Sequence, residues 1–250
     1  MKRTSLLVGL FLLASSALTA QSITGVHVVI VGSDGNETVR AEGSEGDLST
    51  ISDAVRAAFK GLIKSEMVLP VSEVGHDALY SKFVSLLTSC GTDDMLLTIW
   101  IGPWIPDSAH PELSQFAGVT STPITAEYLL NLIHFMPAKT SVNFILSPQR
   151  YRYPMELLTA YPSSAASGGK HAIVVGAAER MSYEEVVEGF VQTLKEMEEQ
   201  AVLDANKDRV VTESEWLRQF DAVARKNRVS LLPYWLESAA DVRLFQTRDE

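Results

Sequence analysis

Four short runs of almost uninterrupted apolar residues constrain the fold of this chain most strongly. These runs are Gly25–Gly32, Asp94–Gly102, Ser141–Ser147 and His171–Gly176. A strand with apolar residues at consecutive positions is buried on both faces, which is typical of the strands in a parallel sheet. The first run ends in Ser33-Asp34-Gly35, residues that favour a turn. The sequence therefore predicts a sheet with at least these strands at its centre.

Amphipathic segments separate the predicted strands. Apolar residues recur at helical spacing in Leu48–Lys64, Ala78–Leu87, Thr125–Met136 and Ser182–Met197. Thr125 is expected to cap the third helix, and Val68–Val71 to form a short strand that Pro70 interrupts. Strands joined by helical crossovers form a mostly parallel sheet with both faces covered. We therefore predict an α/β fold, a three-layer α/β/α sandwich.

Composition sets limits on stability and partners. The chain has 250 residues, 46% of them hydrophobic, and 21 basic against 31 acidic side chains give a net charge of −10. A single domain of this length buries roughly 70% of its unfolded surface, so the core suffices without disulfides. Indeed Cys90 is the single cysteine, so the chain holds no second thiol with which it could form a disulfide. The acidic balance opposes binding to nucleic-acid phosphates, so we expect no nucleic-acid partner.

The first residues are typical of a secretory signal peptide. An apolar stretch follows Lys2 and Arg3, and small residues follow the stretch. We expect residues 1–20 to contain the signal peptide, cleaved after Ala17 or after Ala20, and residues 21–250 to form the domain. The alternative is an uncleaved anchor, but the apolar stretch is shorter than the ~20 residues of a membrane span. The expected location is the periplasm or the cell exterior, with no membrane span after cleavage.

Residues 204–215 (DANKDRVVTESE) match a twelve-residue calcium loop of the EF-hand type. The expected ligands are Asp204, Asn206, Asp208, the Val210 carbonyl, Thr212 and Glu215. Arg209 stands where a glycine normally allows the sharp turn, and a left-handed backbone there costs roughly 1 to 2 kcal/mol. We expect one weak Ca²⁺ site between two helices. The alternative is a capping box at Thr212 and Glu215 after a polar turn that binds nothing.

The order of these elements resembles the caspase-fold cysteine peptidases, with the legumain family and its bacterial relatives closest. The resemblance runs from the strand that ends in GSDG at Gly32–Gly35, through the TAEYLLNLI helix and the VNFILSPQ strand, to IVVGAAE and a later EGF. It covers roughly residues 25–245. Bacterial members often carry a D-x-N-x-D loop similar to the one at Asp204. The resemblance therefore implies a caspase-like sandwich with an EF-hand-like helix-loop-helix near the C-terminus.

The resemblance also implies that the catalytic pair is lost. In that family a histidine in Gly-His-Gly follows the strand that resembles Asp94–Gly102, and the nucleophilic cysteine ends the next strand. This chain has Pro103 and Gln149 at those positions. Proline has no titratable group and glutamine is no nucleophile, so a thiolate and imidazole cannot meet there. We expect a pseudopeptidase that acts by binding or structure.

The alternative is an active hydrolase with an unrecognised site, such as a cysteine peptidase that uses Cys90. Cys90 precedes the strand at Asp94, whereas sites in open parallel sheets lie beyond the carboxyl ends of the strands. A buried thiol is the interpretation we prefer. The five histidines show no spacing typical of a zinc site.

Aromatic and cationic residues flank the two lost catalytic positions. They are Trp104, Arg150, Tyr151 and Arg152. If the fold is caspase-like, these residues meet at the carboxyl end of the sheet, where a peptidase holds its substrate. We expect this rim to bind a protein or peptide whose identity the sequence does not give. The alternative is that the aromatic residues only pack the loops.

Overall fold

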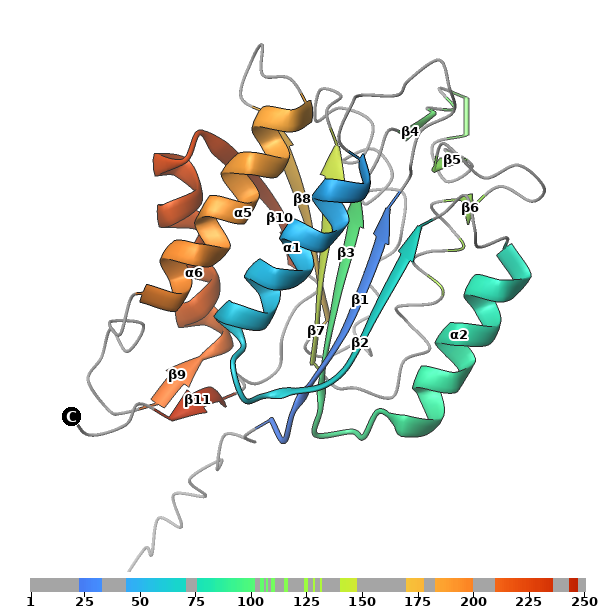
Figure 1. Ribbon diagram of the computed structural model, residues 1–250, viewed down its shortest axis with the longest axis horizontal. Coiled ribbons are helices and arrows are strands. Elements are labelled where there is room, and N and C mark those ends of the chain that lie inside the picture. The colour runs from blue at the N-terminus through green and yellow to red at the C-terminus, as the bar shows by residue number, and fades with distance from the viewer. Residues whose placement is uncertain are drawn as a thin grey trace, which may run out of the picture.

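A six-stranded sheet forms the centre of the computed structural model (Figure 1). The structure describes residues 23–32, 44–70, 76–101, 104–105, 107, 109–110, 115–116, 124–125, 128, 131, 140–147, 170–177, 183–199, 210–235 and 243–246. The strands are β1 (Val26–Gly32), β2 (Ile63–Pro70), β3 (Met95–Ile101), β7 (Thr140–Ser147), β8 (Lys170–Ala177) and β10 (Val229–Trp235). They lie in the order β10-β8-β7-β3-β1-β2, and only β10 pairs antiparallel. The four predicted strands are β1, β3, β7 and β8, the central four.

Helices cover both faces of the sheet. They are α1 (Ser44–Ala58), α2 (His76–Ser89), α5 (Tyr183–Glu199) and α6 (Glu213–Lys226). Residues of α1, α5 and α6 share one buried core with Ile99 and Ile101 of β3. Side chains alternate along a strand, and the intervening Trp100 stacks on Phe83 of α2 at 6.2 Å on the opposite face. The predicted three-layer α/β/α sandwich is confirmed.

An aromatic cluster joins β7, α5 and α6 in the larger core. The ring of Phe144 on β7 lies 5.2 Å from both Phe190 on α5 and Phe220 on α6. Trp216 lies one turn before Phe220, with 5.1 Å between the two rings. All four rings are almost completely buried. Because aromatic side chains bury much apolar area in fixed orientations, this cluster holds α5 and α6 against the sheet.

The structure corrects two predicted boundaries. The helix predicted over Leu48–Lys64 ends at Ala58, and a turn with Gly61 in the left-handed region (φ 80°) leads into β2 at Ile63. The helical spacing of apolar residues continues past the end because Phe59 and Leu62 pack on the core from the turn. The strand predicted over Val68–Val71 was too short, since β2 begins earlier and has polar residues at its start.

Short strands complete the described structure. A three-stranded antiparallel sheet follows β3 and consists of β4 (Trp104–Ile105), β5 (Gln115–Phe116) and β6 (Ile124–Thr125).

The Tyr128 N–H donates to Thr125 Oγ1 at 3.2 Å, as predicted for a helix cap. Of the helix predicted over Thr125–Met136, only Tyr128 and Asn131 are described as helical. None of the described helices is long and apolar enough to cross a bilayer.

A second small sheet lies next to the start of α6. It pairs β9 (Val210–Thr212) with β11 (Arg243–Gln246) in antiparallel orientation. Figure 1 shows this sheet beside the amino end of α6. The segment after α5 is thus joined to the C-terminal part of the chain just before α6 begins.

Candidate functional site

The carboxyl edge of the sheet is where the resemblance to the caspase-fold peptidases led us to expect the positions of a catalytic pair. Strands β3 and β7 are parallel neighbours, and Ile101 pairs with Leu146, so both strands end at the same edge. Pro103 and Gln149 follow these ends in the sequence and lie outside the described residues. Arg150, Tyr151 and Arg152 also lie outside them. Trp104, the first residue of β4, belongs to the small sheet that follows β3. The proposed binding rim therefore stays a prediction.

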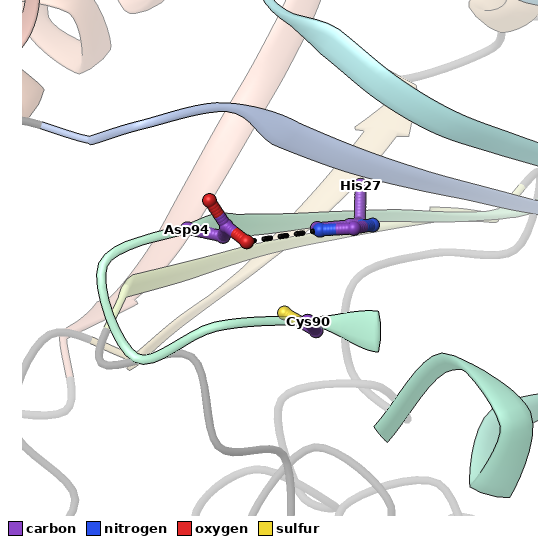
Figure 2. A group of neighbouring side chains, drawn as sticks. All are labelled: His27, Cys90 and Asp94. Carbon is purple, nitrogen blue, oxygen red and sulfur yellow. Dashed lines mark hydrogen bonds and ion pairs between the residues drawn. The ribbon is translucent and has the colours of Figure 1, made fainter. Parts of the chain in front are cut away.

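A side-chain cluster at the opposite, amino edge was not predicted from the sequence. The cluster consists of His27, Cys90 and Asp94 (Figure 2). Each side chain offers one atom that can bind a metal ion, and these three atoms lie within 4.8 Å of one another. His27 is the second residue of β1, Cys90 follows α2, and Asp94 precedes β3. Their exposed fractions are 3%, 6% and 3%. The parallel pairing of β1 with β3 brings together residues that stand 67 positions apart, which no local spacing reveals.

Asp94 is the centre of a hydrogen-bond network. Its Oδ2 accepts from the Gly91 N–H at 2.9 Å and lies 3.1 Å from His27 Nε2. Its Oδ1 accepts from Lys64 Nζ at 2.6 Å and from the Thr24 hydroxyl. Burial favours a raised pKa for Asp94, but hydrogen bonds from Lys64, Thr24, Gly91 and His27 together hold the pKa well below its usual range. The carboxylate is therefore ionised at neutral pH.

The histidine of the cluster already has a hydrogen-bond partner at each ring nitrogen. Nδ1 lies 2.7 Å from Ser65 Oγ, and Nε2 faces Asp94. A general base needs a nitrogen that can take the thiol proton, and neither nitrogen is left for Cys90. The Cys90 sulfur lies 3.8 Å from the Gly91 carbonyl oxygen. What the arrangement does offer is a nitrogen, a sulfur and an oxygen ligand for a metal ion.

A feature of the sequence could have pointed to this cluster. His27 stands within an otherwise apolar strand, and a buried imidazole needs polar partners. Cys90 and Asp94 stand just before the neighbouring central strand, near the level at which β1 begins. Parallel pairing of the two predicted strands places these residues at one edge. The proximity of His27, Cys90 and Asp94 is missed when each histidine and the cysteine are considered separately.

The calcium loop is described only in its last part. Asp204, Asn206 and Asp208 lie outside the described residues, and Val210 begins β9. The Thr212 N–H donates to Glu215 Oε2 at 3.0 Å, and the Glu215 N–H donates to Thr212 Oγ1 at 3.4 Å. These bonds form the capping box that was the alternative interpretation. Helices α5 and α6 flank the loop as the sequence predicted, while calcium binding itself stays a prediction.

Comparisons with known proteins give the fold. The sequence matches no protein-family model and no curated protein. A Geobacter sulfurreducens protein of known structure aligns at a TM-score of 0.54 and 9% identity, over 84% of this chain and 92% of that one. The Drosophila initiator caspase Dronc aligns at a TM-score of 0.50 and 12% identity, over 92% and 88%. This chain has a caspase-like fold. At such low identity the caspase-like fold is all that these neighbours establish.

Proposed function

We propose that this protein is an exported, catalytically inactive relative of the legumain-like peptidases, which binds one calcium ion and acts through binding. The position of its single cysteine carries the proposal. Cys90 precedes β3, whereas the nucleophile of the peptidases that the sequence resembles ends the strand equivalent to β7. Strand β3 has 7 residues, which at about 3.3 Å per residue separates Cys90 from the carboxyl edge by roughly 20 Å. The only thiol is therefore at the wrong end of the sheet.

The competing function is a cysteine peptidase that uses Cys90. Three observations argue against it. The Cys90 side chain is 6% exposed, both nitrogens of the nearby His27 face other groups, and the cluster lies at the amino edge of the sheet. A peptide bond would have to reach a buried sulfur, and the nearby His27 already uses both ring nitrogens in contacts with Ser65 and Asp94. The geometry favours a protein without thiol catalysis.

Calcium binding is the second part of the proposal. It is supported by the position of Glu215 and by the packing of the two helices that flank the loop. Glu215, which corresponds to loop position 12, lies on the first turn of α6 with 7% of its side chain exposed. Its carboxylate is oriented toward the loop by Thr212, at position 9. The aromatic cluster packs α5 against α6, so the helices on either side of the loop are held in place. A loop with fixed ends loses less entropy when it closes around an ion.

Calorimetric titration of Ca²⁺ into the chain from residue 21 tests the calcium site. We expect a Kd between about 10⁻⁶ and 10⁻³ M, and no binding for Glu215→Gln, which removes the bidentate carboxylate. Glu213→Gln on the same helical turn makes the same charge change and should bind as the wild type does. Absence of binding at several millimolar Ca²⁺ would leave a capped helix at Thr212 and refute the site.

The third part of the proposal is the surface that binds the partner, which is the binding rim. Trp104, Arg150, Tyr151 and Arg152 follow β3 and β7, whose carboxyl ends are neighbours in the sheet. We propose that they hold a protein or peptide ligand where the peptidases of this fold hold substrate. Pulldown with Arg150→Ala and Arg152→Ala combined should lose the partner, whereas Arg225→Ala, an exposed arginine on α6, should retain it. Equal partner recovery with the rim variant argues against this surface.

A further inference from the structure

The cluster at the amino edge has the composition of a metal site. We propose that His27, Cys90 and Asp94 bind one divalent cation of the zinc class. Imidazole nitrogen, thiolate sulfur and carboxylate oxygen are the three protein ligand types that zinc uses. Here they converge from the start of β1, the end of α2 and the start of β3, which are parts of the rigid sandwich. This inference is independent of the proposed calcium loop.

The distances suit a shared ion. The three ligand atoms lie within 4.8 Å of one another, and His27 Nε2 is 3.1 Å from Asp94 Oδ2. Two ligands about 2.0 to 2.1 Å from one tetrahedral zinc lie roughly 3.3 Å apart. Figure 2 shows the imidazole and the carboxylate pointing toward each other, with the Cys90 side chain beside them. The imidazole and the carboxylate already have this spacing, and binding requires the Cys90 sulfur to move closer to them.

The surrounding hydrogen bonds orient the ligands as metal sites require. Ser65 Oγ lies 2.7 Å from His27 Nδ1, and a metal-bound histidine almost always uses its other ring nitrogen in such a bond. A serine hydroxyl both donates and accepts, so Ser65 suits either tautomer of the ring. Lys64 and Thr24 hold Asp94 Oδ1 and leave Oδ2 directed at His27. These contacts prepare the site before any ion arrives.

The proton balance of binding is simple. Without metal, the Nε2 proton lies between His27 and Asp94, and on binding this proton moves to Nδ1, where Ser65 accepts it. Cys90 loses its thiol proton to solvent, so one proton is released for each ion bound. The thiolate and the Asp94 carboxylate offset the two positive charges. Three protein ligands leave one corner of the tetrahedron to water, which predicts weaker binding than at four-ligand structural sites.

The ion has a route to the buried ligands. Gly91, Thr92 and Asp93 form an exposed turn between Cys90 and Asp94. The Gly91 N–H bonds Asp94 Oδ2 at 2.9 Å, so local opening of this turn exposes the oxygen that the metal would use. Slow uptake and release of metal is the expected consequence.

Titration with Co²⁺ of the purified protein, first stripped by a chelator, tests the proposal. A thiolate bound to Co²⁺ gives a charge-transfer absorption band in the near ultraviolet. We expect this band to saturate at one equivalent, to disappear when Zn²⁺ is added, and to persist in excess Ca²⁺, which prefers oxygen ligands. Cys90→Ala should show no band. Ser65→Ala, which keeps all three ligands, should bind Co²⁺ about 10- to 100-fold more weakly.

A matched pair of acidic variants completes the test. Asp94→Asn should lose the band, and Asp93→Asn, which changes the neighbouring exposed carboxylate, should keep it. Circular dichroism of each variant checks that the fold is retained. The proposal is overturned if the folded wild type shows no thiolate band, or if Cys90→Ala binds Zn²⁺ as tightly as the wild type. Because the wild-type spectrum alone decides the first outcome, a variant that fails to fold leaves the test intact.

Discussion

Replacement of Asp94 by asparagine should strongly destabilise this protein. The Asp94 carboxylate is 3% exposed and accepts hydrogen bonds from Thr24, Lys64 and Gly91, with His27 Nε2 at 3.1 Å. It thereby joins the segment before β1, the start of β2 and the turn before β3. An amide can accept on one side only, because its NH₂ group faces donors on the other.

The magnitude follows from the bonds that are lost. Hydrogen bonds to a charged group contribute about 1.5 to 3 kcal/mol each, and Asp94→Asn loses at least two of them. Because Lys64 is 43% exposed, water can solvate its ammonium group in the Asp94→Asn variant. The variant therefore does not bear the full cost of an unpaired buried charge. Two bonds give about 3 to 6 kcal/mol, and because Lys64 is partly exposed we expect a loss at the lower end, about 3 to 4 kcal/mol in the free energy of unfolding at neutral pH.

The same change should alter the dependence of stability on pH. The folded state lowers the pKa of Asp94 below the value of about 3.9 for an unfolded chain. A lowered pKa stabilises the fold above the unfolded pKa, and this stabilisation is lost as the pH falls through the folded pKa. The difference between the wild type and Asp94→Asn should thus be complete near pH 6 and should shrink below about pH 4.

Urea denaturation followed by tryptophan fluorescence measures both effects, since Trp100 and Trp216 are buried. A chelator in every sample removes any contribution of bound metal. Asp93→Asn is the control, and as a surface change it should alter stability by no more than about 0.5 kcal/mol. A loss below about 1 kcal/mol for Asp94→Asn, or a difference that stays constant in acid, would refute the central role of this carboxylate.

Three further substitutions test the packing around α5 and α6. Thr212→Ala removes half of the capping box and should cost about 0.5 to 2 kcal/mol in urea denaturation; an unchanged midpoint would contradict it. Gly189→Ala places a Cβ 2.4 Å from Val229 Cγ2 and should cost about 1 to 3 kcal/mol, seen as a lower thermal midpoint. Phe220→Ala opens a cavity beside Trp216 and should cost about 3 to 5 kcal/mol, and a loss below about 1 kcal/mol would show that the cluster is loosely packed.

The central strands were predictable because both of their faces are buried. In β1, β3 and β7, apolar residues on one face belong to the core shared with α1, α5 and α6, and on the other face Trp100 of β3 stacks on Phe83 of α2. The edge strands lack this signal. Lys64 and Glu66 make the start of β2 resemble the end of a helix, and Pro233 within β10 is tolerated because that strand pairs on one side only.

The candidate sites differ in how far the sequence could predict them. The capping box at Thr212 and Glu215 was readable because its two residues interact three positions apart within one turn. The cluster of His27, Cys90 and Asp94 was not, because its members come from three elements and meet only when β1 pairs with β3. Sequence spacing reveals side chains that meet on one helix or loop. It does not reveal side chains that are brought together by the pairing of distant strands.

An activity measurement tests the central claim, that this caspase-like fold works without thiol catalysis. The chain from residue 21 is incubated with a thiol-reactive peptidase probe and a broad mixture of peptide substrates, with and without Ca²⁺, and Cys90→Ala serves as the matched variant. We expect no probe labelling of the folded protein and no peptide cleavage above that of Cys90→Ala. Labelling of Cys90 together with cleavage that disappears in Cys90→Ala would contradict the claim and identify the protein as a peptidase.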